Sequence, residues 1–246
     1  MSGVTQPGKI WGVGLGPGDP ELMSVRADRL VRGARHVAFF RKAGRAGRAR
    51  AIVEGMLAEG AVEFPMEYPV TTEIPLDDPR YNEILSAFYT DVTAHLIALA
   101  KAGEDVAVLC EGDPFFYGSF MHLHDRLVGR VPVEVVPAIT GMSAAWTATG
   151  RPVTWGDDVL TVLMGTLPEE ELTRRIAETD ALVVMKLGRK LPQVARAVEA
   201  ARRLEEAWLV QYASMEGQNV QPLAEAMDRE APYFSIVVIH GRGRRP

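Results

Sequence analysis

The sequence predicts an α/β protein built from two α/β domains. Apolar runs of strand length alternate with longer segments of helical period, and this alternation is interrupted once near the middle of the 246-residue chain. Domains most often contain about 100–150 residues, so the length also favours two. We place an N-terminal domain at residues 1–140, a linking helix and turn at 141–153, and a C-terminal domain at 154–246.

The expected elements follow from the period of the apolar residues and from turn and cap residues. In the first half, strands are predicted at 9–15, 36–40, 105–110 and 131–136, and helices at 20–32, 90–101, 117–127 and 140–150. In the second half, strands are predicted at 159–164, 181–187, 207–213 and 234–240, and helices at 169–178, 193–203 and 221–229. Residues 66–79 hold three prolines and clustered acids, which predicts an irregular excursion.

The composition excludes several classes of function. With 27 basic and 32 acidic residues the net charge is -5, which lacks the electrostatic footprint of a nucleic-acid-binding protein. The single cysteine, Cys110, excludes an internal disulfide and a thiolate zinc site, and it fits a reducing compartment. Residues 1–9 are polar and unlike a secretory signal, and no apolar run has transmembrane length. We therefore expect a cytoplasmic protein with no membrane or nucleic-acid partner.

The first glycine-rich segment, residues 12–20 (Gly-Val-Gly-Leu-Gly-Pro-Gly-Asp-Pro), lies where a strand meets a helix. Glycine allows close approach of a ligand to the backbone, and Asp19 can cap the helix that Pro20 opens. The spacing fits neither the dinucleotide-binding fingerprint nor a P-loop. A tight strand-to-helix turn with no ligand is the alternative at this stage.

Two further segments follow predicted strands. Residues 111–119 (Glu-Gly-Asp-Pro-Phe-Phe-Tyr-Gly-Ser) and 136–145 (Val-Pro-Ala-Ile-Thr-Gly-Met-Ser-Ala-Ala) both begin where an apolar strand ends. In open α/β sheets, ligands bind outside the carboxyl ends of the strands, so both segments are placed to contact a polar ligand. The alternatives are that Asp113 satisfies backbone amides of its own loop and that Thr140 and Ser143 cap a helix.

The order and separation of these three segments resemble the tetrapyrrole methylase family, the class III methyltransferases. Gly-x-Gly-Pro-Gly-Asp-Pro-Glu-Leu near the N-terminus, Glu-Gly-Asp-Pro-x-x-Tyr-Gly-Ser and Pro-Ala-Ile-Thr carry the resemblance, which covers essentially the whole chain. The extended second segment and the residues at 64–66, 184–186 and 233–235 are most similar to the members that methylate precorrin-2. Ala138 departs from the glycine that is common in the third segment of the family.

The resemblance implies a homodimer that binds S-adenosylmethionine in a cleft between its two domains. It implies methyl transfer to the C-20 meso carbon of precorrin-2, which gives precorrin-3A in cobalamin biosynthesis, without a metal. Asp19 is the candidate base for the displaced proton, and Arg26 and Tyr117 are candidate substrate contacts. The implied cofactor contacts, largely through backbone, are Pro17, Asp113, Phe116, Thr140, Met164, Tyr212, Ala213 and Ile236.

The run from Arg41 to Arg50 contains five cations and no acid. Arginine makes bidentate bonds to carboxylates, so Arg45 and Arg48 are candidate contacts for the acetate and propionate groups of a tetrapyrrole. A solvated loop is the alternative. His122 and His124 are two residues apart on a predicted helix and point in different directions, which disfavours a metal site.

Several other functions remain open at this point. Within the family, the enzyme can act on cobalt-precorrin-2 or uroporphyrinogen III, or it can methylate a different corrinoid carbon. Diphthine synthase is a more distant alternative. Outside catalysis, the chain can be a silent member that uses the fold to bind a nucleotide. Product analysis with S-adenosylmethionine and precorrin-2 separates these functions.

Overall fold

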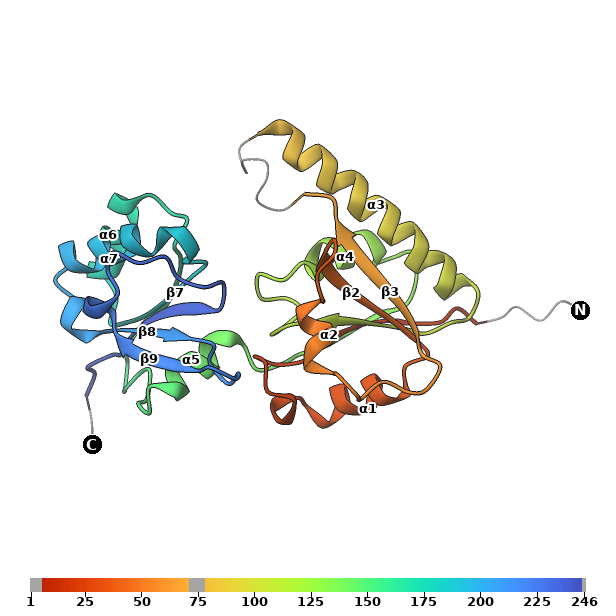
Figure 1. Ribbon diagram of the computed structural model, residues 1–246, viewed down its shortest axis with the longest axis horizontal. Helices are drawn as coiled ribbons and strands as arrows, with labels where there is room; N and C mark the ends of the chain where they lie inside the picture. Colours follow the sequence, from red (N-terminus) through yellow and green to blue (C-terminus); the bar gives the residue numbers. More distant parts are fainter. Residues whose placement is uncertain (1–5, 71–77, 245–246) are drawn as a thin grey trace, which may run out of the picture. The chain divides into compact units, whose positions relative to one another are not determined.

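The computed structural model describes residues 6–70 and 78–244, and its chain divides into two compact units, residues 1–140 and 141–246. Each unit contains one five-stranded sheet with helices packed on it (Figure 1). The α/β fold class predicted from the sequence is therefore confirmed. Parts of two predictions, the polar N-terminus at 1–5 and the excursion at 71–77, lie outside the described residues.

The first unit is built on a parallel sheet with the strand order β3-β2-β4-β1-β5. Its strands are short, and β1 and β4, which lie inside the sheet, are apolar, as expected for strands covered on both faces. They are β1 (Ile10–Gly14), β2 (His36–Lys42), β3 (Val62–Tyr68), β4 (Val106–Cys110) and β5 (Val133–Val136).

Helices cover both faces of this sheet. Core residues of α1 (Val25–Gly33) and α2 (Arg48–Ile52) pack on one face, and those of α3 (Pro79–Lys101) and α4 (Phe120–Leu127) pack on the other. The neighbouring strands β1 and β4 are thus followed by helices on opposite faces. In doubly wound sheets, a crevice for ligands opens at such a position, outside the carboxyl ends of the strands.

Two predictions for the first unit were wrong. The irregular excursion predicted at 66–79 begins too early, because residues 62–68 form strand β3, which pairs with β2 at the edge of the sheet. Pro65 sits within β3, and an edge strand tolerates proline because the missing N–H leaves no central ladder bond unmade. Helix α3 begins at Pro79 instead of residue 90, because Asp78 accepts the N–H of Arg80 and proline suits the first turn.

The second unit has a mixed sheet with the order β6-β7-β10-β8-β9. Its strands are β6 (Leu160–Met164), β7 (Ala181–Met185), β8 (Ala207–Gln211), β9 (Asn219–Pro222) and β10 (Ser235–Ile239). Strand β10 runs antiparallel to β7 and β8, while β6 and β7 are parallel. The first residue of β10 therefore lies at the same edge as the last residues of β6, β7 and β8.

Helices α6 (Glu169–Ala177) and α7 (Leu191–Ala200) share the larger core of this unit. Helix α5 (Gly141–Ala148), which the sequence suggested as a linking helix, packs through Ala145 against Val210 and Val238 of the second sheet. The helix predicted at 221–229 is wrong. That segment completes β9 and continues as the single 3-10 turn η4 (Leu223–Glu225), because Pro222 ends one element and Leu223 is buried in the core.

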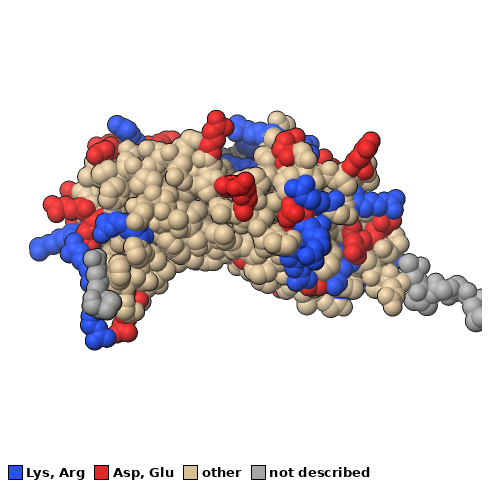
Figure 2. All heavy atoms as spheres, turned by 90° about the horizontal axis from the view of Figure 1, so that it is seen from below, with Lys and Arg blue, Asp and Glu red and all other residues tan. Residues whose placement is uncertain are grey.

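On the face drawn in Figure 2, Lys and Arg side chains lie among Asp and Glu side chains, with no extended area of one sign. Within the described ranges, no helix combines the length and apolar character needed to span a bilayer.

Candidate cofactor and substrate site

The loop after β1 carries the first glycine-rich segment. It leads into the 3-10 turn η1 (Pro20–Leu22), and the Asp19 carboxylate accepts the backbone N–H of Glu21 at 2.9 Å. Gly16 has a φ of +82°, a conformation that costs other residues strain. Asp19 therefore caps a single 3-10 turn and not the helix predicted at 20–32, which begins at Val25 with Ser24 as its cap. The base role of Asp19 stays a prediction.

This loop is joined directly to the loop after β4. The N–H of Gly112 donates to the carbonyl of Gly16 at 2.8 Å, and the N–H of Leu15 donates to the carbonyl of Cys110 at 2.9 Å. These bonds join the first and second glycine-rich segments just beyond the paired strands, and Gly16 and Gly112 form an isolated antiparallel bridge. This places their backbones side by side at the carboxyl edge of the sheet.

Asp113 connects the second segment to the third. Its Oδ1 accepts the N–H of Phe115 and its Oδ2 accepts the N–H of Ala138, both at 2.9 Å. The carboxylate thus holds the turn of its own loop and fixes the backbone just after β5. Such bonds to an ionised acceptor are stronger than those between neutral groups. The alternative role predicted for Asp113, satisfying backbone amides, describes its contacts in this structure.

Gly14 lies where the three segments meet. A Cβ atom built on it would stand 2.7 Å from the Cβ of Ala138 and 2.8 Å from the Cδ of Pro114. Both distances are too short for real side chains. The last residue of β1 is therefore in direct contact with the second and third segments, and only glycine permits this packing.

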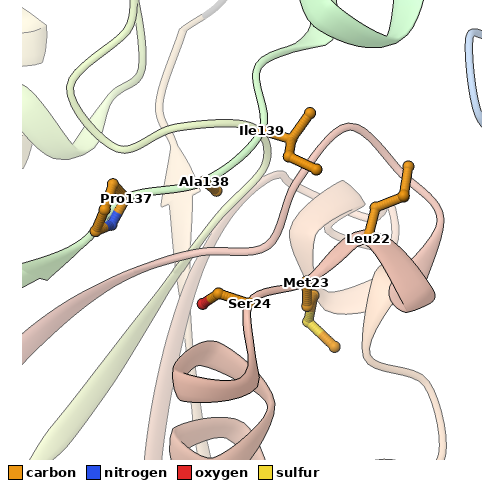
Figure 3. A pocket seen from close by; sticks show the side chains of 6 residues that line it. All are labelled: Leu22, Met23, Ser24, Pro137, Ala138 and Ile139. Atoms are coloured by element: carbon orange, nitrogen blue, oxygen red, sulfur yellow. The ribbon is translucent and has the colours of Figure 1, made fainter.

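An open pocket of about 420 Å³ lies beside this junction. Its lining is mostly apolar and consists of Leu22, Met23, Ser24, Pro137, Ala138 and Ile139. Figure 3 shows that the residues from 22 to 24 and those from 137 to 139 lie on opposite sides of the pocket. The pocket thus opens at the carboxyl edge of β5, where residues 22–24, which follow the first segment, face the third segment.

The aromatic residues of the second segment differ in exposure. The ring of Phe116 packs edge-on against Tyr117, with 4.9 Å between ring centroids. Phe115 and Tyr117 are each nearly half exposed, and Tyr117 has a φ of +55°. Exposed rings on a constrained loop offer an apolar surface to a large flat ligand.

Glu111 lies directly after β4, in the second segment, and its residue type alone predicted no role for it. Burial raises the pKa of its carboxyl group to about 7, against the opposing effect of the positive charge of Arg48. Strongly shifted groups of this kind gather at functional sites. The signal in the sequence is an acid that ends an entirely apolar strand.

The basic run does not form one uniform loop. Arg41 belongs to β2 and pairs with Glu67, and Arg50 lies in α2 and pairs with Glu63 and Glu54. Arg45 is exposed in the turn between these elements, and Arg48 is exposed at the start of α2. The alternative of a solvated loop is therefore wrong for Arg41 and Arg50, which lie in a strand and a helix and pair with acidic residues.

Arg26 lies away from the loops described above. It forms an ion pair with Glu134 of β5 and stands over the ring of Trp11 in β1, 5.3 Å from its centroid. Trp11 and Glu134 are neighbours in the sheet, well before the carboxyl ends of their strands. The structure therefore does not bring Arg26 to the edge that carries Asp19, Asp113 and Tyr117.

The remaining cofactor candidates gather at one edge of the second sheet. Met164 ends β6, Tyr212 and Ala213 follow β8, and Ile236 is the second residue of β10. Tyr212 has a φ of +52° and donates its N–H to the carbonyl of Phe234 at 2.8 Å. Gly141, next to Thr140, leaves the Cδ1 of Ile236 3.7 Å from the place of a Cβ. In each unit, the predicted cofactor-binding residues thus lie at one edge of the sheet.

Polar atoms at this second edge fit an organic cofactor with hydroxyl and amino groups. The hydroxyl groups of Ser214 and Ser235 are buried and have no hydrogen-bond partner within the described part of the chain. Buried polar atoms of this kind normally find a partner, and a nucleoside offers donors and acceptors. No three His, Cys, Asp or Glu side chains of the described residues come together in a metal-binding arrangement.

Comparison with known proteins gives one consistent result. The profile of the Tetrapyrrole (Corrin/Porphyrin) Methylases matches residues 9–226. A precorrin-2 C(20)-methyltransferase from Sinorhizobium sp is 51% identical over 246 residues, which cover 100% of both chains. A cobalt-precorrin-2 C(20)-methyltransferase from Salmonella typhimurium is 27% identical over 95% of this chain and 96% of its own.

A solved structure agrees in fold. The uroporphyrin-III C-methyl transferase from Thermus thermophilus, complexed with S-adenosyl homocysteine, aligns with a TM-score of 0.65 at 24% identity. The alignment covers 95% of this chain and 92% of that one. From the profile match and the full-length relative, the chain belongs to the tetrapyrrole (corrin/porphyrin) methylase family.

Proposed function

We propose that this protein transfers a methyl group from S-adenosylmethionine to the C-20 meso carbon of precorrin-2, giving precorrin-3A in cobalamin biosynthesis. The observation that carries the proposal is the junction at Gly14, where three separate segments meet at the carboxyl edge of one sheet. The full-length identity of 51% to a precorrin-2 C(20)-methyltransferase supports the choice of substrate and position.

The chain's own residues contribute mainly by positioning. In the first unit, Pro17, Asp113, Phe116 and Thr140 would hold the cofactor, and Asp113 does so by fixing the amides of Phe115 and Ala138. In the second unit, Met164, Tyr212, Ala213 and Ile236 would contribute, largely through backbone. Bound S-adenosylmethionine supplies a methyl group already activated by its sulfonium. Alignment of the reactants is therefore the main source of acceleration required of the protein.

The tetrapyrrole would contact exposed residues of the first unit. Tyr117 offers an aromatic surface, and Arg45 and Arg48 offer cations for the carboxylate side chains. Arg26 ranks lower, since its guanidinium already pairs with Glu134.

Product analysis tests the reaction directly. Purified protein is incubated with S-adenosylmethionine and precorrin-2, and the mass and methyl position of the product are determined. Precorrin-3A supports the proposal. Methylation of cobalt-precorrin-2 in preference to the metal-free substrate, or at another carbon, assigns the chain to a different member of the family.

Ligand binding is tested separately by calorimetry with S-adenosylmethionine and S-adenosylhomocysteine. We expect one site per subunit for each ligand. A folded sample that binds neither would overturn the methyltransferase assignment and favour a silent member of the family.

We further propose that the enzyme is a cytoplasmic homodimer. The family resemblance supports the dimer, and the single, buried Cys110 is compatible with a reducing compartment. Sedimentation equilibrium gives the mass directly, and a particle of one 26.9 kDa chain would contradict the dimer.

A further inference from the structure

Glu111 occupies a central place at the carboxyl edge of the first sheet. It follows β4, which lies between β2 and β1, and its neighbour Gly112 is bonded to Gly16 of the first segment. Alternate residues of a strand point to the same face, and Leu109 belongs to the core under α1 and α2. Glu111 directly follows this strand, and continued alternation together with the effect of the Arg48 charge on its carboxyl group puts the Glu111 side chain on the face covered by α2, whose first residue is Arg48.

The carboxylate of Glu111 differs from the two other acids at this edge. Asp19 accepts an N–H from the turn that it caps, and Asp113 uses both oxygens for backbone amides. Glu111 is partly buried, and no residue that the structure describes donates a hydrogen bond to it. It is therefore the acid whose oxygen lone pairs are available to a ligand.

A structural role does not explain this placement. Partial burial of a carboxylate that receives no hydrogen bond from the described residues costs stability, and an apolar residue at this position would cost less. Arg48 compensates only in part, because burial still raises the pKa of Glu111 to about 7. A carboxyl group with a pKa near neutrality is well matched to accepting a proton at physiological pH.

We propose that Glu111 is the general base that removes the proton from C-20 of the tetrapyrrole. The inference rests on the proposed function. The new carbon–carbon bond forms between C-20 and the methyl carbon, while the methyl–sulfur bond breaks and its electron pair stays on sulfur. The C-20 proton then passes to a carboxylate oxygen of Glu111, and its bonding electrons restore the conjugation of the macrocycle.

Burial raises the pKa of Glu111, and several charged groups lie on the elements around it. They are Arg48 on α2, Asp113 in the same loop, Asp19 in the loop after β1 and Arg41 in β2, which pairs with Glu67. Of these groups, Arg48 lowers the pKa of Glu111. Removing the charge of Arg48 should therefore move the titration of the base to higher pH.

The test compares wild type with Glu111→Gln, Glu111→Asp and Arg48→Gln. Initial rates with saturating S-adenosylmethionine and precorrin-2 are measured from about pH 5.5 to 8.5, and cofactor affinity is measured by calorimetry. For wild type, the maximal rate should fall with pH below about 7, as the base becomes protonated. Glu111→Gln should lower the rate by about 100-fold or more and abolish this dependence, with unchanged cofactor affinity.

The other two variants separate the base from a structural role. Glu111→Asp should recover part of the rate and keep a pH-dependent limb, while Arg48→Gln should shift that limb upward. A Glu111→Gln variant with a wild-type rate and pH profile would overturn the inference while leaving the proposed function intact. If the wild-type protein itself forms no precorrin-3A, the proposed function fails, and this outcome is distinct from the first.

Discussion

The Oδ2 atom of Asp113 accepts a hydrogen bond of 2.9 Å from the backbone N–H of Ala138, and this bond ties the loop after β4 to the segment after β5. Asp113→Ala removes it together with the bond from Phe115. We expect cofactor binding to weaken by about 1–3 kcal/mol, the usual cost of losing one partner of such a bond, with a smaller fall in maximal rate. Calorimetry and steady-state kinetics check the two effects.

Asp113→Asn serves as the matched variant, since it keeps the shape and one acceptor oxygen. Its effect on cofactor affinity should be about half that of alanine. Because Glu111 is the proposed base, Asp19→Ala should not lower the rate more than it lowers cofactor affinity, and a larger fall in rate would instead support the base role that the sequence predicts for Asp19. An Asp113→Ala protein with normal cofactor affinity and a collapsed rate would mean that Asp113 takes part in the chemistry.

Glu111 also affects stability in a pH-dependent way. Its pKa is about 7 in the folded protein, against an ordinary value of 4.5, so the folded state holds the proton more tightly. The resulting stabilisation is fully present below about pH 4.5 and is lost as the pH rises through about 7. From this group alone, wild type should lose up to about 3 kcal/mol between these limits.

Thermal unfolding of wild type and Glu111→Gln across this range measures the effect. The variant should lack this loss of stability. Its unfolding temperature relative to that of wild type should therefore be higher at about pH 8 than at about pH 5. Parallel curves for the two proteins would show that Glu111 is not held in a desolvated environment.

The elements predicted well from sequence are those with strong local signals. The apolar strands that became β1, β4 and β7 are buried on both faces, and their runs of Val, Leu and Ile stand out from the flanking polar residues. Strands β3 and β9 were missed because each contains a proline and lies at an edge, where the partner strand and not the local sequence determines pairing.

The candidate site divides in the same way. The three segments were placed correctly at the ends of strands, because a strand end is a local feature. The bond from Ala138 to Asp113 and the effect of Arg48 on Glu111 join residues far apart in the chain. The strength of both interactions depends on how deeply the residues are buried, and burial at a single position cannot be predicted from the local sequence. The cofactor contacts of the second unit depend on family resemblance and stay predictions.

The ion pairs of the basic run separate two roles for its arginines. Arg50 pairs with Glu63 and Glu54 and is 21% exposed, so Arg50→Ala should lower stability by about 1 kcal/mol with little effect on substrate affinity. Arg45 and Arg48 are exposed, so the double alanine variant should weaken precorrin-2 binding and leave cofactor binding unchanged. The loss should be greatest at low salt. Equal substrate affinity of variant and wild type at low salt would leave these arginines without a binding role.

Gly14 provides the sharpest test of the junction on which the proposed function depends. A methyl group at this position would lie 2.7 Å from the Cβ of Ala138, 2.8 Å from the Cδ of Pro114 and 2.8 Å from the carbonyl of Val136. Overpacking of this kind typically costs about 1–3 kcal/mol, and here relief requires the second and third segments to move. Gly14→Ala should therefore lower thermal stability and weaken S-adenosylmethionine binding together.

Gly33→Ala is the control for the Gly14 variant, since it makes the same chemical change in α1 where a Cβ meets no atom within 4 Å. It should bind the cofactor as wild type does and be equally or more stable, because alanine favours a helix over glycine. If Gly14→Ala keeps normal affinity despite a lower unfolding temperature, the junction stabilises the fold without shaping the cofactor site. The cofactor contacts would then have to be sought away from the three segments.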